Sequence, residues 1–322
     1  MNLSLGPFQG ITDAPFRNVF KQHFGGIDKF YTPFFTGIQK DHAKNLQVEE
    51  IDPRCNDVEH LTPQILSTDA EEILRFATQC KQLGYKEINL NMGCPFPRVA
   101  NKKRGSGLLP YPEKVDEMLA TVFEKIDVKF SVKCRLGYFS PDEIYPIIEV
   151  FNKYPLSELI VHPRIGKQLY KGEADIERFK ELIPNIKAPL IYNGDIVSVE
   201  SFNRISTMVQ PVNDFMLGRG LLSNPFLAED IKGFETESIE KRNQRMHAYV
   251  LDLYEERLRH AGGSPKVLGR MKELWSYMKD SFDESQDIWR KIKKINALKE
   301  YEDAVEDVFR FATLKDNSSF SM

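Results

Sequence analysis

Cys94 stands in the segment NLNMGCPFPRV, directly after a run of residues typical of a β-strand. Gly93 before it and Pro95 after it favour a tight turn that exposes the side chain. Most lone cysteines are buried and inert, but this position favours a chemical role. A thiol with an ordinary pKa of about 8.5 is largely protonated at neutral pH, so Cys94 could act as a general acid.

Lys133 lies inside the strand-like run KFSVKCRLG. Side chains alternate along a strand, so Lys133 should share one face with Ser131 and Arg135. Lysines are rarely buried without an electron-rich partner. A flavin, which gains negative charge at its N1/O2 edge on reduction, would be such a partner. A buried carboxylate would satisfy the lysine equally well.

Two glycine-containing segments, YNGDI and LGRG, end the last two strand-like runs of the chain. Their glycines would let backbone N–H groups approach an anion, and Arg219 stands beside them. Either segment alone could be an ordinary turn. Together they favour a phosphate site, because the loops after strands seven and eight bind phosphate in many (β/α)8 barrels.

The residues KKRGSG at positions 102–107 follow the cysteine segment and combine three cations with two glycines. Because glycine relaxes the limits on backbone conformation, this stretch suggests a mobile basic loop. A solvated charge run is the alternative, and it is the commoner use of such a stretch.

Eight strand-like runs alternate with amphipathic helical segments such as AEEILRFATQCKQLG. The alternation predicts a parallel sheet, and eight units within about 220 residues favour a closed (β/α)8 TIM barrel over an open sheet. The runs are LSLGPF, FYTPFF, LTPQILS, KEINLNMG, KFSVKCRLG, SELIVHPR, APLIYNGDI and NDFMLGRG, and the second has the weakest strand pattern.

Polar or charged residues end seven of the eight runs, and core packing does not explain so many. A barrel builds its active site from the carboxyl ends of its strands, so these residues should converge on one rim. They are Pro7 and Gln9, Gln64, Asn91 and Cys94, Lys133 and Arg135, His162 and Arg164, Asn193 and Asp195, and Gly218 and Arg219.

Strand-like runs disappear after Pro225, and from about Ser238 the chain has a helical pattern. We therefore expect a barrel domain over residues 1–237, followed by an all-helical domain over residues 238–322. An apolar stripe at i, i+3, i+4 spacing should pack one tail helix into a core. The stripe comprises Val267, Leu268, Met271, Leu274, Trp275 and Met278.

The tail is the more basic part of a chain whose net charge is −3. Residues 1–240 carry 28 Lys and Arg against 33 Asp and Glu, whereas residues 241–322 carry 16 against 14. Eight cations and five carboxylates stand between positions 266 and 294. They could meet RNA phosphates, or they could form a solvated helix surface joined by i, i+4 ion pairs.

The composition excludes several classes of protein. No stretch of the 322 residues is long and apolar enough for a membrane span, and the N-terminus lacks the pattern of a secretory signal, so a cytoplasmic location is expected. The four cysteines lack C-x-x-C spacing, which predicts free thiols and no metal. No G-x-G-x-x-G segment joins a strand to a helix, so a nicotinamide nucleotide should bind only transiently.

Over essentially its whole length the chain resembles the tRNA-dihydrouridine synthases. The matching segments are GPFQGITDAPFR, LNMGCP, the glycines of GSG, SVKCRLG, HPRIGKQLYKGEAD, YNGDI and LGRG. Three positions depart from the usual pattern, since Gly6, Phe8 and Asn89 replace alanine, methionine and aspartate. The helical tail is most similar to the bacterial branch that acts on tRNA position 16.

The resemblance implies an FMN-dependent reduction of uridine in tRNA to 5,6-dihydrouridine. NADPH would reduce FMN and leave, hydride would pass from flavin N5 to uracil C6, and Cys94 would protonate C5. The target base must be extruded from the folded RNA. FMN would contact Pro7, Phe8, Gln9, Gln64, Lys133, His162, Asn193, Gly194, Asp195, Gly218 and Arg219.

We expect a monomer that contacts its tRNA at the barrel rim and along the basic tail. The predicted contacts are Asn91, Arg135, Lys266, Arg270, Arg290, Lys291 and Lys294. Two other functions share this barrel. A small-molecule flavin reductase, such as a relative of dihydroorotate dehydrogenase, would not need the basic tail. A non-enzymatic RNA-binding barrel would not need Cys94, Lys133 or the phosphate motifs.

Overall fold

The computed structural model describes residues 1–38, 48–260 and 263–315. Its strands form one parallel sheet in the order β3-β2-β1-β9-β8-β7-β6-β5-β4. The strands are β1 (Asn2–Leu5), β2 (Lys29–Tyr31), β3 (Leu61–Thr62), β4 (Gln64–Ile65), β5 (Glu87–Met92), β6 (Lys129–Gly137), β7 (Leu159–Ile165), β8 (Leu190–Asn193) and β9 (Asp214–Leu217).

The sheet closes through its third strand-like run. That run supplies both β3 and β4, which are the two ends of the strand order and are separated only by Pro63. Proline has no N–H to donate, so it interrupts the strand. β3 pairs with β2 and β4 pairs with β5, and the predicted TIM barrel of eight strand positions is therefore confirmed.

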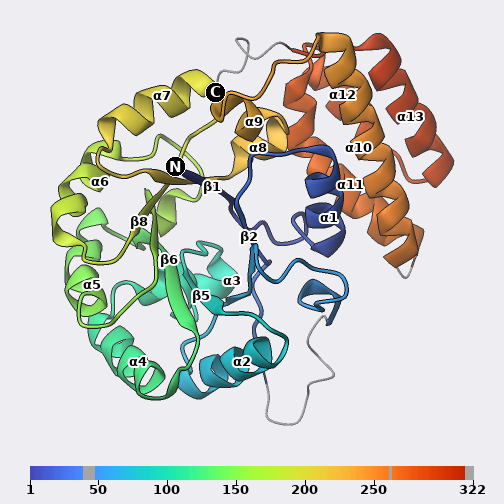
Figure 1. Ribbon diagram of the computed structural model, residues 1–322. Coiled ribbons are helices and arrows are strands. Elements are labelled where there is room, and N and C mark those ends of the chain that lie inside the picture. Colours follow the sequence, from blue (N-terminus) through green and yellow to red (C-terminus); the bar gives the residue numbers. More distant parts are fainter. Residues whose placement is uncertain (39–47, 261–262, 316–322) are drawn as a thin grey trace. The chain divides into compact units, whose positions relative to one another are not determined.

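Helices surround the barrel strands in Figure 1. They include α2 (Ala70–Gln82), α4 (Pro112–Lys125), α5 (Ile144–Phe151), α6 (Ile176–Leu182) and α7 (Val199–Met208), with the short α3 (Pro97–Ala100) after β5. The barrel interior is packed, not open. One buried cluster draws a side chain from each of four strands: Tyr31, Ile160, Ile191 and Met216.

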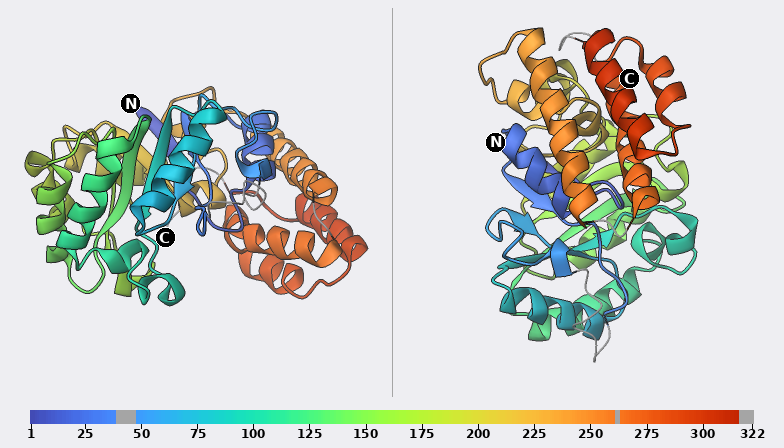
Figure 2. Two further views of the ribbon diagram at one scale, coloured as in Figure 1. Left: turned by 90° about the horizontal axis from the view of Figure 1, so that it is seen from below. Right: turned by 90° about the vertical axis from the view of Figure 1, so that its right-hand side faces the viewer.

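The C-terminal helices pack around the predicted apolar stripe. α10 (Ile239–His260), α11 (Ser264–Met278), α12 (Ser285–Ile292) and α13 (Leu298–Phe311) lie side by side in both views of Figure 2. All six stripe residues of α11 are buried, which confirms that part of the prediction. Trp275 has no exposed surface, and its indole N–H donates to the Tyr301 hydroxyl at 3.0 Å.

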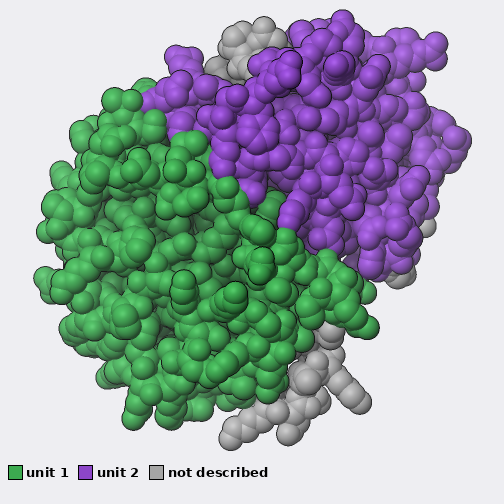
Figure 3. Space-filling view, viewed as in Figure 1, with its two compact units in different colours: residues 1–7, 28–195, 204–216 green, residues 8–27, 196–203, 217–322 purple. Residues whose placement is uncertain are grey.

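Figure 3 shows two compact units. Unit 1 comprises residues 1–7, 28–195 and 204–216, and unit 2 comprises residues 8–27, 196–203 and 217–322. Unit 2 contains α1 (Ala14–His23), α8 (Arg219–Ser223) and α9 (Leu227–Ile231) together with α10 to α13. The domain boundary expected at residue 238 stays a prediction. Within the described ranges, no helix has the length and apolar character needed to cross a membrane.

Candidate active site

A chain of side-chain hydrogen bonds crosses β4, β5 and β6 in unit 1. Asn91 Nδ2 donates to Gln64 Oε1 at 2.8 Å, and Gln64 Nε2 donates to Asn89 Oδ1 at 2.8 Å. Asn89 Nδ2 then donates to Ser131 Oγ at 3.0 Å. All four side chains are buried. Because each amide nitrogen only donates and each amide oxygen only accepts, the chain fixes the orientation of every member.

Asn91 also holds the turn that carries Cys94. Its Oδ1 accepts the backbone N–H groups of Gly93 at 3.1 Å and Cys94 at 2.9 Å. From the other side, the Ser106 N–H and hydroxyl donate to the Cys94 carbonyl oxygen at 3.1 and 3.0 Å. Both polar atoms of the Asn91 amide therefore bond within the protein: the oxygen bonds to the Cys94 turn and the nitrogen to Gln64.

The Cys94 side chain is only 8% exposed. Burial raises the pKa of its thiol, and this outweighs the backbone N–H of Phe96 and the nearby cations, which lower that pKa. The thiol is therefore protonated at neutral pH. It meets the requirement for a general acid, namely a proton held in a confined site.

The glycines after the cysteine lie in a buried 3-10 helix, η2 (Gly105–Leu108), not in the mobile loop that the sequence suggested. Gly105 has a φ of +56°, and a Cβ there would lie 2.6 Å from the Cys94 carbonyl oxygen. A Cβ at Gly107 would lie 2.1 Å from the Ala100 carbonyl oxygen. Glycine is required here because the backbone segments pack directly against each other.

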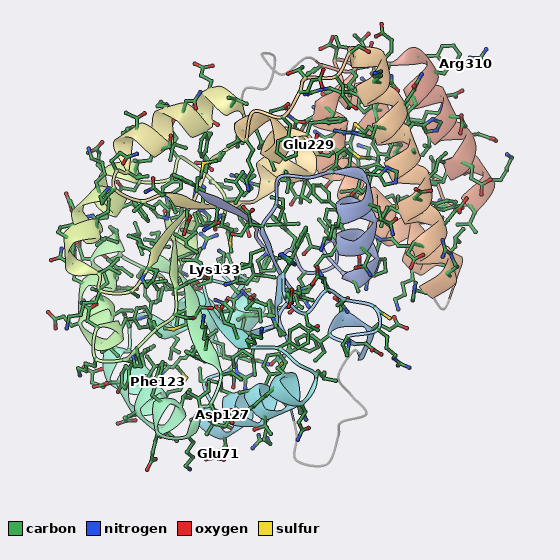
Figure 4. All side chains as sticks on the ribbon, viewed as in Figure 1. Glu71, Phe123, Asp127, Lys133, Glu229 and Arg310 are labelled. Atoms are coloured by element: carbon green, nitrogen blue, oxygen red, sulfur yellow. The ribbon has the colours of Figure 1, made fainter. Side chains whose placement is uncertain are left out.

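Lys133 and Arg135, two positions apart on β6, have no carboxylate partner among the described residues. Lys133 has no hydrogen bond or ion pair with any residue that the structure describes, and burial lowers its pKa to about 8, with a further contribution from the charge of Arg135. Arg135 is 2% exposed and donates to the Ile165 carbonyl oxygen at 2.9 Å. In Figure 4, Lys133 lies among the barrel strands, whereas Glu71 and Asp127 lie at the periphery. The described residues thus offer no buried carboxylate as the partner of Lys133.

Arg164 organises the end of β7. It donates to both carboxylate oxygens of Asp195, at 2.8 and 2.6 Å, and its Nη1 donates to His162 Nε2 at 3.0 Å. A guanidinium cannot accept a hydrogen bond, so His162 Nε2 must be the acceptor and the ring proton lies on Nδ1. The sequence placed Arg164 at this strand end but gave it no role. Its position two residues after His162, on the same strand face, was the available signal.

Packing requires glycine at position 194 but not at position 218. Asn193 Nδ2 donates to the Met216 carbonyl oxygen at 2.8 Å, and a Cβ at Gly194 would lie 2.2 Å from the Tyr192 hydroxyl. In unit 2, a Cβ at Gly218 would make only ordinary contact, at 3.6 Å from the Phe8 ring. Pro7 and Phe8 are half-buried and Gln9 is exposed. The phosphate role of these segments, including Arg219, stays a prediction.

Comparison with known proteins supplies the family. The model of the family described as Dihydrouridine synthase (Dus) matches residues 4–316. The chain belongs to the dihydrouridine synthase family. It is 25% identical over 300 residues to the tRNA-dihydrouridine(16) synthase of Neisseria meningitidis, covering 90% of each chain. It is 30% identical over 224 residues to tRNA-dihydrouridine synthase B of Pasteurella multocida, covering 69% of this chain and 66% of that one.

A solved structure shares the fold. Histamine dehydrogenase from Rhizobium sp. 4-9 superposes with a TM-score of 0.53 at 13% sequence identity, over 78% of this chain and 49% of that one. The synthase thus spans about half the length of that enzyme, and the likeness concerns the barrel architecture alone. Family membership makes the protein an oxidoreductase that acts on uridines of tRNA.

The basic cluster of this dihydrouridine synthase divides into paired and free cations. Arg270 pairs with Asp13, which also binds Arg257 at 3.2 Å, so Arg270 has a structural partner in unit 2. Two further predicted RNA contacts are paired on the helix surface, Arg290 with Asp287 at 2.5 Å and Lys291 with Asp307 at 2.6 Å. Four lysines have no carboxylate partner among the described residues: Lys266, Lys272, Lys293 and Lys294.

Proposed function

We propose that this chain reduces specific uridines of tRNA to 5,6-dihydrouridine with FMN as its resident cofactor and NADPH as a transient reductant. The observation that carries the proposal is the buried, protonated Cys94 thiol next to the uncompensated cations Lys133 and Arg135. A pair of cations without a carboxylate favours an anionic or electron-rich ligand, and FMN meets that description. When bound, the flavin would supply the hydride for uracil C6.

The chain's own residues would then act as follows. Cys94 gives its proton to C5 of the extruded base, and Asn91 holds the backbone turn that aims the thiol. Lys133 and His162 would hold the flavin ring, and Gln64, whose amide is engaged by Asn91 and Asn89, would act by fixing these neighbours. We infer that Asp195 acts indirectly, because its carboxylate is taken up by Arg164. The strand ends that carry Gly194, Gly218 and Arg219 would bind the FMN phosphate.

Two measurements on the purified protein test this function directly. We expect it to carry or take up FMN, seen as visible absorbance, and to form dihydrouridine in unmodified tRNA transcripts when NADPH is added, seen by mass spectrometry. A colourless protein that cannot be reconstituted with FMN would contradict the proposal. A protein whose bound flavin is reduced by NADPH but that forms no dihydrouridine would also contradict it. Action at position 16, a monomeric state and a cytoplasmic location stay predictions.

The affinity for FMN should fall as the pH rises through about 8, the pKa of Lys133. Burial lowers this pKa, so the ammonium loses its proton above that pH and no longer attracts the electron-rich ligand. The Kd for FMN should rise by up to about tenfold per pH unit. Fluorescence titration of the flavin-free protein measures it. Lys133→Met should bind FMN weakly and without this pH dependence, and an equal pH dependence in both proteins would contradict the assignment.

The free lysines of the tail should contribute more to tRNA affinity than the paired cations. Reversing Lys266, Lys293 and Lys294 to glutamate should raise the KM for tRNA, because counterion release is lost at each phosphate contact. The log–log salt dependence should weaken by about 0.9 per lost contact. Reversal of Arg290 and Lys291, which already have carboxylate partners, is the matched control. Equal effects of the two variants would show that pairing does not decide which cations meet RNA.

A further inference from the structure

Unit 1 exposes large aromatic side chains at one end of the barrel. Among the residues that the structure describes in this unit, they are Phe96 at 47%, Phe139 at 60% and Tyr170 at 39% exposure. They lie on the loops that follow β5, β6 and β7. Cys94 follows β5, Lys133 lies in β6 and His162 lies in β7. Since the carboxyl ends of parallel strands share one rim, these rings border the proposed active site.

The three loops pack against one another. A Cβ at Gly166 would lie 2.6 Å from Ser106 Oγ and 2.3 Å from the Tyr138 ring. Lys167 donates its backbone N–H to the Tyr138 carbonyl oxygen at 3.0 Å. The Tyr138 ring in turn meets the Phe139 ring edge to face, with centroids 4.7 Å apart. The exposed Phe139 is thus part of a continuous surface that includes the loop bonded to the Cys94 backbone.

The loop that carries Phe139 is held in place by a carboxylate. Glu143 accepts the backbone N–H groups of Tyr138 at 2.6 Å, Phe139 at 3.3 Å and Ser140 at 3.2 Å. These bonds fix the backbone of the loop and engage both oxygens of Glu143. The other acidic side chain of the loop, Asp142, pairs with Arg178 at 3.2 Å. Because the backbone under Phe139 is already fixed, the loop loses little conformational freedom when a ligand stacks on the ring.

A cation without an acidic partner lies beside Phe139. Lys167 Nζ lies 5.1 Å from the Tyr138 ring centroid and 5.4 Å from that of Phe139, with no carboxylate partner among the described residues. The loop after β5 is basic as well. Between Glu87 and Glu113 the sequence has no acidic residue and contains Arg98, Lys102, Lys103 and Arg104. Exposed rings flanked by cations match the base and the phosphate of an unpaired nucleotide.

We propose that Phe139, with Lys167 beside it, stacks an unpaired nucleotide that flanks the target uridine, and that Phe96 offers a further stacking face. This inference rests on the proposed function and specifies the form of its substrate. The RNA next to the target uridine must present unstacked bases, as single-stranded loops do and duplexes do not.

The substitution Phe139→Leu tests the stacking step, because it keeps an apolar side chain and removes the aromatic face. Phe139→Leu should weaken binding of a tRNA transcript and of a uridine-containing single-stranded RNA on the order of five- to a hundredfold, the loss of about one stacked base. Phe139→Trp should restore it. Phe311→Leu is the matched control, because Phe311 is 70% exposed on α13 of unit 2 and does not belong to the loops after β5, β6 and β7.

Fluorescence anisotropy with the single-stranded RNA and with the same sequence as a duplex gives the decisive comparison. Weaker binding of the duplex by the wild-type protein supports the inference. Unchanged binding and unchanged KM in Phe139→Leu overturn it, as does equal loss in the Phe311→Leu control. Failure of the proposed function has a different signature, because the wild-type protein would then form no dihydrouridine in any tRNA.

Discussion

Replacing Cys94 by alanine should stop the reduction of uridine in tRNA, while the protein keeps its flavin and still oxidises NADPH. Only the proton for C5 is lost, and a positioned general acid contributes on the order of 10²–10⁴-fold to a rate. The burial that raises the pKa of the Cys94 thiol adds a pH signature. At saturating FMN, wild-type reduction of tRNA should persist up to a pH above the ordinary thiol pKa and fall beyond it, since only the protonated thiol can donate.

Cys55 provides the control for the thiol chemistry, because it is exposed and forms no disulfide. Cys55→Ala should reduce tRNA at the wild-type rate and with the wild-type pH profile. Single-turnover mixing of the reduced enzyme with tRNA separates the two half-reactions. Wild-type tRNA reduction by Cys94→Ala would remove this cysteine from the mechanism, and an unchanged high-pH limb in that variant would assign the limb to another group.

Replacing Asn91 by alanine should lower kcat for tRNA by about 100-fold, the typical loss when a reacting group moves by roughly 1 Å. The two N–H groups of Gly93 and Cys94 would lose their acceptor, and the Gln64 amide would lose a donor. Asn91 was predicted to contact the substrate. Its engaged amide favours positioning of Cys94 as the hypothesis to test, and the substrate contact stays a prediction.

The split between kcat and KM distinguishes the two roles of Asn91. Positioning lowers kcat and leaves the KM for tRNA unchanged, whereas a lost substrate contact raises KM. Asn91→Asp keeps an oxygen acceptor for the Cys94 turn and should recover much of kcat. If the alanine variant shows a raised KM with a wild-type kcat, Asn91 is a substrate contact after all.

The barrel was predictable because its signals are local. Alternating apolar residues mark each strand, and helical periodicity marks each connection, so the eight runs could be found one at a time. The number of units predicted that the sheet closes, but the sequence did not show how it closes. Closure depends on Pro63 dividing one run between two partner strands, β2 and β5, whose pairing joins distant parts of the chain.

Partners of charged side chains were the least predictable part of the site. Asp195 looked like a flavin contact at its strand end, yet it pairs with Arg164, which lies 31 positions earlier. Arg270 looked like an RNA contact, yet it pairs with Asp13, 257 positions away. The number of cations in a segment is a property of the sequence, but which of them stay free depends on the tertiary fold. For Lys133 the tertiary structure supports the prediction, because the lysine has no carboxylate partner among the described residues. This favours the flavin that its strand position suggested.

The central claim is that this chain makes dihydrouridine in tRNA, and mapping that base across the tRNAs of a deletion strain tests it most directly. We predict that dihydrouridine disappears from one position, expected to be position 16. Expression of the wild-type chain should restore it, and expression of Cys94→Ala should not. Persistence of dihydrouridine at every position in the deletion strain would contradict the account.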